Sequence, residues 1–312
     1  MDNKLIAVAE IVGIGACVAD MLYTVPQFPK EDTKLRAKGS VMAGGGPVAT
    51  GLVAAAKLGG RSAYLGVLSK DASGAFLKND FEKYGVETSG VVTYDSSFSS
   101  FTSCIWLNEE TGSRTCVFDR GNLPAYQLNN AAHSMLEQAS ILMVDGNELE
   151  AAIEGADYIH RFGGKVLYDA GGLYTGVERL LPKADILIPS AEFALGITGV
   201  ATIEEAARCL HETYEPEVVV ITDGKDGGVI YRGETAERYP AFPVRALDSN
   251  GAGDVFHGAF AAGLLKGFDY KMCCYFASAV SAIKCTGVGA RESVPDLETV
   301  RQFLKERNCD IF

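Results

Sequence analysis

The chain has 312 residues, of which 47% are hydrophobic and 22% are charged. This composition is typical of a globular protein and excludes a largely disordered chain. The 28 Lys and Arg against 40 Asp and Glu give a formal charge of −12, which disfavours a nucleic-acid-binding protein, because neutralising phosphates requires a surplus of basic residues. No apolar run reaches the roughly 18–20 residues of a membrane-spanning helix, and the segment MDNKLIAVAEIVGIG lacks the basic region of a signal peptide. We therefore expect a cytoplasmic protein with no membrane or nucleic-acid partner.

Short apolar runs rich in β-branched residues alternate with amphipathic segments. The strand-like runs lie at 6–15, 62–69, 140–146, 165–171, 184–190 and 217–224. The helix-like segments lie at 47–59, 73–85, 129–139, 148–163 and 202–214. Continuous apolar strands alternating with helices predict an α/β fold with a mostly parallel central sheet covered by helices on both faces. No repeat or linker divides residues 1–312, so we expect a single domain.

Two regions lack a helical period and contain short strand-like runs separated by polar turns. They lie at 17–43 and 91–119. In the second region, the turn-forming sequence NEETGS at 108–113 predicts a β-hairpin. We expect both regions to form a small β-sheet that acts as a lid over a site at the carboxyl edge of the central sheet.

The segment DSNGAGDVFHGAF at 248–260 carries the most specific chemical signal. Gly251, Ala252 and Gly253 lead directly into an apolar helix, and small residues there let a phosphate approach the N–H groups of the first turn. Asp254 stands in that turn, where a carboxylate can accept the proton of a substrate hydroxyl. Taken alone, the motif is equally compatible with an Asp254 that only satisfies backbone donors.

Other patterns exclude several classes of protein. GIGA at 13–16 begins like a dinucleotide-binding fingerprint, but Val18 stands where the third glycine belongs, and no P-loop motif is present. A dehydrogenase and a P-loop NTPase are therefore disfavoured. The eight cysteines form no C-x-x-C pair and the four histidines are far apart, so neither a zinc site nor a disulfide framework is predicted.

In chain order, these segments resemble the ribokinase-like superfamily, also called the phosphofructokinase-B carbohydrate kinase family. The resemblance covers nearly the whole chain and rests on GIGACVAD (13–20), the glycine pair and helix at 45–59, ITDGKDGG (221–228), the 248–260 block and AIKCTGVGARESVP (282–295). GGGPVAT, GAGDVFHGAF and AIKCTG look nearest to the sulfofructose and fructose kinase branch. The resemblance implies a ribokinase-like fold, ATP and Mg²⁺ as cofactors with a monovalent cation such as K⁺ as a further one, and a homodimer formed through the lid.

The resemblance also implies roles for individual residues. Asp254 corresponds to the catalytic base, and Gly251, Ala252 and Gly253 correspond to the anion hole. The positions that correspond to sugar-binding residues are Asp20, Gly45, Gly46, Thr50 and Lys34. The positions that correspond to the ATP site are Ser190, Thr222, Gly224, Gly227, Asn250, Ala282, Cys285 and Gly289.

Three positions depart from the family pattern. Thr50 stands where many sugar kinases of the family carry an asparagine, and Asn250 stands where the signature usually has a threonine. The N-x-x-E motif tied to magnesium and phosphate is replaced by Ser190-Ala191-Glu192-Phe193. Glu192, one position away, is the candidate for holding Mg²⁺ through water. Lys34 in the lid, and Arg114, Arg120 and Arg291, are candidates for meeting an anionic group.

We therefore predict an ATP-dependent sugar kinase that phosphorylates a hydroxyl of a ketose-like sugar of the fructose or sulfofructose type. The alternatives within the fold are a ribokinase and a nucleoside kinase. In a nucleoside kinase, aromatic side chains would stack on the base, and the candidates are Tyr23, Phe98, Phe101 and Trp106. A sugar sensor without turnover is a third alternative, which the intact GAGD block disfavours, because a sensor needs no general base.

Overall fold

Six parallel strands form the centre of an eight-stranded sheet in the computed structural model, which describes residues 8–309 and 311–312. In sheet order the strands are β14 (Thr235–Tyr239), β13 (Gly228–Arg232), β12 (Val218–Thr222), β11 (Ile186–Pro189), β10 (Lys165–Ala170), β9 (Ile141–Val144), β1 (Ile11–Ile14) and β4 (Ser62–Leu65). β13 and β14 add an antiparallel edge. The mostly parallel sheet expected from the sequence is thus confirmed.

The sequence expectations differ from the structure at both edges of this sheet. The antiparallel strands β13 and β14 were not predicted, and four of the five residues of β14 are exposed, so an apolar run is missing there. The run at 62–69 was predicted as one strand but is two, because Gly66 separates β4 from β5 (Val67–Ser69). Residues 6 and 7 of the run at 6–15, and most of the segment assessed for a signal peptide, lie outside the described residues.

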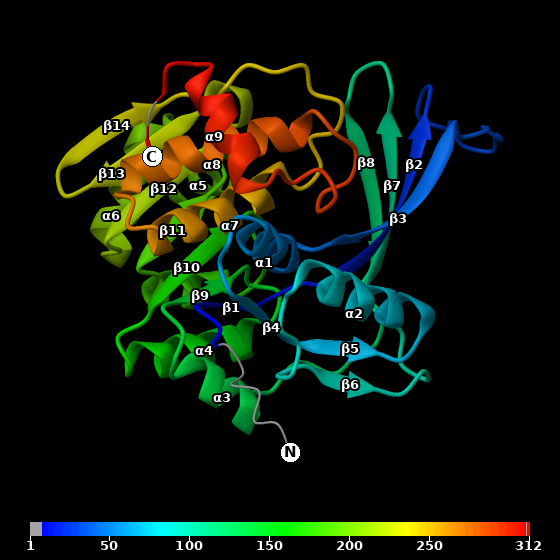
Figure 1. The fold of residues 1–312 in the computed structure, drawn as a ribbon, viewed down its shortest axis with the longest axis horizontal. Helices are drawn as coiled ribbons and strands as arrows, with labels where there is room; N and C mark the ends of the chain where they lie inside the picture. The colour runs from blue at the N-terminus through cyan, green and yellow to red at the C-terminus, as the bar shows by residue number, and fades with distance from the viewer. Residues whose placement is uncertain (1–7, 310) are drawn as a thin grey trace.

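Helices cover both faces of the sheet (Figure 1). The helices on one face are α1 (Pro47–Lys57), α2 (Ala72–Tyr84), α7 (Ala252–Leu265), α8 (Tyr270–Cys285) and α9 (Leu297–Lys305). Those on the other face are α3 (Asn130–Leu136), α4 (Leu149–His160), α5 (Ala191–Thr198) and α6 (Ile203–Tyr214). Short 3₁₀ turns lie at η1 (Val177–Arg179), η2 (Leu181–Lys183) and η3 (Gly224–Asp226). Each strand contributes side chains to the hydrophobic cores on both faces of the sheet, because successive residues point to opposite faces. In β9, Ile141 and Met143 pack on the first face, and Leu142 and Val144 pack on the second.

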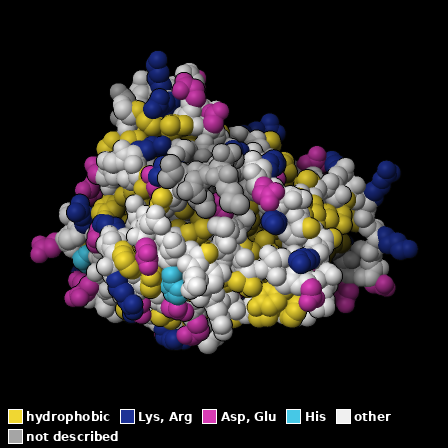
Figure 2. Space-filling model, turned by 60° about the horizontal axis from the view of Figure 1, so that its bottom comes forward, with side chains coloured by type: hydrophobic (Ala, Val, Ile, Leu, Met, Phe, Trp, Pro, Cys, Tyr) yellow, Lys and Arg dark blue, Asp and Glu magenta, His cyan; other side chains and the backbone are white. Residues whose placement is uncertain are grey.

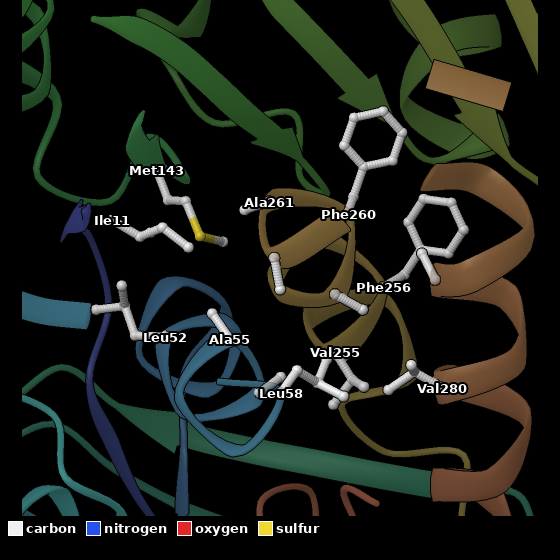
Figure 3. Packing of buried hydrophobic residues seen from close by; sticks show 14 of the residues in the cluster. Ile11, Leu52, Ala55, Leu58, Met143, Val255, Phe256, Phe260, Ala261 and Val280 are labelled. Carbon is white, nitrogen blue, oxygen red and sulfur yellow. The ribbon is translucent and has the colours of Figure 1, made fainter. Parts of the chain in front are cut away.

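The closest helix crossing on the first face joins α1 to α7. A Cβ built at Gly258 would lie 2.0 Å from the carbonyl oxygen of Gly51, so only glycine fits there. Figure 3 shows Leu52 of α1, Leu58 directly after α1, Val255 of α7 and Val280 of α8 as members of one buried cluster. Burial of these side chains contributes roughly 1.5–3 kcal/mol each. The crossing fixes the first turn of α7, which carries Asp254, against α1.

A second, four-stranded sheet projects to one side of this body (Figure 1). Its order is β3 (Gly39–Gly45), β2 (Val18–Val25), β7 (Thr102–Asn108) and β8 (Arg114–Asp119). The hairpin predicted at 108–113 joins β7 to β8. β6 (Val92–Tyr94) lies within the range 91–119 but pairs with β5 in a separate two-stranded sheet. We call the four-stranded sheet the lid.

No helix between residues 8 and 309 is long and apolar enough to cross a bilayer. On the face drawn in Figure 2, Lys and Arg side chains are interspersed with Asp and Glu and do not gather in one area.

Candidate active site

The central sheet has a switch point between β1 and β9. From β1 the chain first moves outward to β4, and later runs the other way through β9, β10 and β11. Such a point opens a crevice at the carboxyl ends of the strands, where α/β proteins bind ligands. A cavity of about 340 Å³ lies there; its lining includes Gly15, Cys17, Phe101, Arg120 and Asn147. The loops after β1 and β9 and the end of β8 therefore enclose one pocket.

Asp145, directly after β9, accepts hydrogen bonds from three backbone segments at the base of this crevice. Its Oδ2 accepts hydrogen bonds from the N–H groups of Ala16 (2.9 Å) and Val48 (3.2 Å), and its Oδ1 accepts one from Asn147 N–H (2.9 Å). Val48 belongs to the first turn of α1, so the carboxylate also satisfies the positive end of that helix. Burial raises the pKa of Asp145. Asp145 was not predicted as a site residue, although an aspartate directly after a buried strand is a recognisable sign of a residue at the carboxyl edge of a sheet.

Asp20 and the glycine pair lie together at the base of the lid. A Cβ at Gly45 would fall 2.1 Å from Asp20 Oδ2, and Gly46 has φ +91°, so both positions require glycine. The Ser103 hydroxyl, from β7, donates to Asp20 Oδ1 at 2.6 Å. Burial raises the pKa of Asp20 to about 6, against the lowering effect of the Ser103 bond. Thr50, one turn into α1, is buried, and its Oγ1 has no hydrogen-bond partner among the described residues.

A buried ion pair between Arg291 and Asp80 supports the Gly45 turn. Arg291 Nη1 lies 2.7 Å from Asp80 Oδ2, Nη2 donates to the Gly45 carbonyl at 2.7 Å, and the guanidinium stacks over Phe81. Arg291 is fully buried. It is therefore wrong as a candidate for meeting an anionic ligand, and serves instead to fix the end of β3.

Asp80→Ala should destabilise the protein by about 3–5 kcal/mol, because it leaves a buried guanidinium without its counter-charge. The measurement is the free energy of unfolding from urea titration. The matched control is Glu237→Ala, which removes the exposed partner of Lys271 and should cost about 1 kcal/mol or less. Similar losses for both variants would show that Arg291 is not held by Asp80.

The loop before α7 makes a tight turn into the helix. Gly251 takes a left-handed conformation with φ +74°, and a Cβ there would meet Ala290 at 2.6 Å and Asp254 Oδ2 at 3.6 Å. The Asp254 carboxylate therefore lies over the turn. A Cβ at Gly253 would meet no atom within 4 Å, so this backbone faces open space. The Ala252 N–H donates to Ser249 O at 3.2 Å, which leaves Gly253 as the better placed of the two donors.

Charged groups surround Asp254. Burial raises its pKa, while the positive charges of His257, Arg114 and Lys284 lower it. Arg114 also lowers the pKa of Asp20, so this exposed lid arginine acts on both carboxylates. A partly exposed carboxylate with a raised pKa is suited to accepting a proton.

A buried histidine supports the same turn from below. His257 Nδ1 lies 2.6 Å from the Gly253 carbonyl and 3.2 Å from Asp169 Oδ2, and Nε2 lies 2.9 Å from the Ile188 carbonyl. Both ring nitrogens therefore lie within hydrogen-bonding distance of oxygen atoms. Burial raises the pKa of Asp169 to about 7, and the His257 charge opposes that shift. Neither residue was singled out from the sequence.

The predicted nucleotide-side residues lie on four segments, which contact one another in two pairs. Ser190 and Thr222 pair through a parallel bridge where β11 and β12 end, and the Ser190 hydroxyl caps α5 by accepting from Phe193 N–H (3.1 Å). Gly224 and Gly227 follow in the turn after β12, both at positive φ. The remaining positions belong to the loop before α7 and to the end of α8 and the turn after it: Asn250, Ala282, Cys285 and Gly289. The Cys285 carbonyl accepts from Leu247 N–H at 2.7 Å, so these two segments are in contact.

Two predicted residues stand apart from the crevice contacts. Lys34 lies exposed in the loop between β2 and β3. Glu192 lies exposed in the first turn of α5. Among the described residues, no cluster of three or more His, Cys, Asp or Glu side chains could hold a metal. Mg²⁺ does not need such a cluster, because it commonly takes one or two carboxylates together with substrate phosphates and water.

Comparison with known proteins identifies the family. The sequence profile of pfkB family carbohydrate kinases matches residues 8–297. The chain belongs to this family. It is 27% identical to the ribokinase of Haemophilus influenzae over 94% of this chain and 97% of that protein. It is 26% identical to a 5-dehydro-2-deoxygluconokinase of Clostridium perfringens over 95% of this chain and 93% of that protein.

Solved structures of pfkB carbohydrate kinases share the fold. The ribokinase of Thermotoga maritima aligns with a TM-score of 0.81 and 27% identity over 95% of this chain and 99% of that chain. The Arabidopsis thaliana ribokinase, solved with ribose and ATP, aligns with a TM-score of 0.83 and 24% identity over 96% and 99%. The predicted ribokinase-like fold and the prediction of an ATP-dependent carbohydrate kinase are confirmed at the level of the family. The nearer likeness to fructose and sulfofructose kinases stays a prediction.

Proposed function

We propose that this pfkB kinase transfers the γ-phosphoryl group of ATP to a hydroxyl of a ketose-like sugar, with Asp254 as the general base. The observation that carries the proposal is the Asp254 carboxylate, which lies over the Gly251 turn where a helix N-terminus faces open space. A proton acceptor next to an anion-binding turn is what phosphoryl transfer to an alcohol requires. The ATP complex of the Arabidopsis ribokinase supports the choice of donor.

Each group has a defined task in this mechanism. The buried Asp20 carboxylate accepts hydrogen bonds from sugar hydroxyls, and the unpartnered Thr50 hydroxyl offers a further bond. Asp254 removes the proton of the reacting hydroxyl. The backbone at Gly253 and the positive end of α7 stabilise the charge of the transferred group. Mg²⁺, when bound, neutralises phosphate charge, with Glu192 as the candidate that holds it through water; the ATP and Mg²⁺ complex of a protein assigned as ribokinase II of E. coli supports its use.

A substrate panel tests the function and the sugar class together. Fructose, sulfofructose, fructose phosphates, ribose and nucleosides are incubated with ATP and Mg²⁺, and phosphorylated products are identified by mass spectrometry. The proposal expects the highest kcat/KM for a ketose or its anionic derivative. Ribose as the best substrate would instead support the ribokinase alternative, which the ribokinase relatives favour. Binding without any product would support the sensor.

Lid charges provide the discrimination between neutral and anionic sugars. Arg120 lines the crevice cavity and donates to Asn147 Oδ1 at 2.7 Å, and Lys34 stands exposed on the lid. If the sugar carries a sulfonate or phosphate that Lys34 meets, Lys34→Ala should cost about 1.5–3 kcal/mol in kcat/KM for that sugar and little for fructose. The matched control is Lys38→Ala, since Lys38 is paired with Glu109 on the same lid. Equal losses for both sugars would leave Lys34 with no role in charge recognition.

The nucleoside kinase alternative has one observation in its favour. Phe101 lines the cavity and could stack on a base, with the Arg120 guanidinium 5.7 Å from its ring centroid. The nucleosides in the substrate panel decide it.

The acidic limb of the pH profile should report Asp20. Its pKa of about 6 means that the carboxylate is protonated below that pH and ionised above it. Because the ionised form accepts hydrogen bonds from sugar hydroxyls, kcat/KM should rise with pH through about 6 and then level off. Ser103→Ala removes a bond to the ionised form, so the limb should move to higher pH, whereas Ser103→Thr retains a hydroxyl and should move it less. An unmoved limb in Ser103→Ala would assign the titration to another group.

We also propose that two copies associate through the lid. Val41 on β3 and Phe118 on β8 are 46% and 60% exposed. They lie on the same face of the lid, because the β2 residues in register with them are two positions apart, and a second lid would cover this apolar area. Analytical ultracentrifugation of the wild type and of Phe118→Ser tests the pairing. A monomeric wild type would contradict it.

A further inference from the structure

A fully buried lysine lies behind the anion-binding loop. Lys284, in the last turn of α8, donates through Nζ to the Asp248 carbonyl at 2.8 Å and to the Asn250 carbonyl, and Nζ lies 3.8 Å from Asp248 Oδ2. The Lys284 side chain and that of Asp248 have no exposed surface. Lysine is seldom fully buried without partners that replace its hydration. Here all three partners are oxygens, and all belong to residues 248–250.

The Asp248 carboxylate connects this cation to a second loop. Its Oδ2 accepts from Gly289 N–H at 2.9 Å, and its Oδ1 accepts from Asn250 N–H at 2.8 Å. The Lys284 charge therefore joins the loop before α7 to the turn after α8. These two segments contain the predicted ATP-site positions Asn250 and Gly289, and residues 248–250 lead directly into the Gly251 turn.

The oxygen set around Nζ is the kind that binds a monovalent metal ion. Backbone carbonyls and a carboxylate can replace the hydration shell of K⁺, as carbonyl rings do in ion channels. In this chain, the ammonium already occupies the space between those oxygens. The K⁺ that the family resemblance implies as a further cofactor thus does not fit at this point of the loop.

We propose that the Lys284 ammonium is a built-in monovalent cation that holds the 248–254 loop in its anion-binding conformation, so that this kinase works without K⁺. The proposal makes Lys284 a positioning residue, because it touches the loop and not the reacting atoms. This proposal rests on the proposed function only in taking the loop to bind the phosphates of ATP. Burial lowers the pKa of Lys284 and the Asp248 charge raises it, and the charge of Lys284 in turn lowers the pKa of Asp254.

The first arm of the test uses the wild-type protein alone. Turnover, ADP affinity by calorimetry and the thermal midpoint are measured in choline chloride, NaCl, KCl and NH₄Cl at equal ionic strength. Turnover and ADP affinity should agree within about twofold across the salts, and the thermal midpoint within about a degree or two, since electrostatic screening is held constant. A wild type that is activated about tenfold or more by KCl, on the order of what one lost hydrogen bond to a charged group costs, would overturn the proposal.

The second arm compares two variants that both remove the charge. Lys284→Ala leaves a space lined by oxygens, whereas Lys284→Met fills that space with an apolar chain of similar length. In choline chloride both should lose on the order of tenfold or more in kcat and in ADP affinity. KCl or NH₄Cl should restore Lys284→Ala and raise its thermal midpoint, but should not restore Lys284→Met.

The outcomes separate this proposal from the proposed function. If Lys284→Ala keeps wild-type values in choline chloride, or if no cation restores a folded Lys284→Ala, the proposal fails. If either variant does not fold, the wild-type arm still decides. If the protein phosphorylates no sugar, the proposed function fails, yet the cation dependence of ADP binding and thermal midpoint still tests the role of Lys284.

Discussion

Asp254→Asn is expected to lower kcat by at least about 100-fold while leaving the fold and ATP binding intact, because it removes the general base and keeps the shape of the side chain. Asp254 is partly exposed in the first turn of α7, so loss of stability should not obscure the result. The measurement is kcat on the best sugar of the panel, with ATP affinity from calorimetry and the thermal midpoint as checks.

The control for this variant is Asp157→Asn, which changes an exposed carboxylate paired with Lys183 on the surface. It should leave kcat unchanged. If Asp254→Asn also turned over the true substrate at a near-wild-type rate, the general base would have to be another group, and the assignment of Asp254 would be wrong.

Gly253→Val should lower kcat by roughly 10–100-fold, with a smaller rise in the KM of the sugar, because the backbone contact to the phosphoryl group strengthens in the transition state. A Cβ at this position meets no protein atom within 4 Å and the residue is not at positive φ, so the variant should fold. The added side chain would stand in the space that the phosphate needs. Steady-state kinetics with both substrates separates the two parameters.

Gly39→Val is the matched control, since a Cβ at Gly39 also meets no atom within 4 Å, but at the start of β3 in the lid. It should change kcat little. A Gly253→Val protein that lost stability but kept its normalised kcat would show that Gly253 serves packing and not phosphate binding.

The sequence was sufficient for the fold because its buried strands are continuous apolar runs. Val218–Thr222 and Ile141–Val144 could be recognised as strands without any neighbour, and the helices between them follow the helical period. The exposed strand Thr235–Tyr239 has no such pattern, since its stability comes from pairing with β13. The formation of such an edge strand depends on cross-strand contacts, which cannot be recognised from the hydrophobic pattern of the segment itself.

The same limit applies to the candidate site. Asp254 and the glycines around it could be named as candidates because the pattern that marks them lies within one stretch of the chain. Lys284 and His257 were missed because their partners are brought close only by folding: Lys284 meets the carbonyls of residues 248 and 250, and His257 meets Asp169 and Ile188. In the sequence, Lys284 is one of several polar residues in a mostly apolar helix. Polar residues of such a helix usually face solvent, so nothing in the sequence marked Lys284 as buried.

The Arg291 link to the Gly45 turn has a consequence for biosynthesis. The guanidinium that holds the Gly45 carbonyl and pairs with Asp80 is separated from them by 246 and 211 positions in the chain. A polypeptide still attached to the ribosome therefore lacks this support of the proposed sugar-binding turn until Arg291 has been made. Nascent chains can build the first β-α-β units early, but the ability to hold a sugar should appear only after residue 291 has left the exit tunnel.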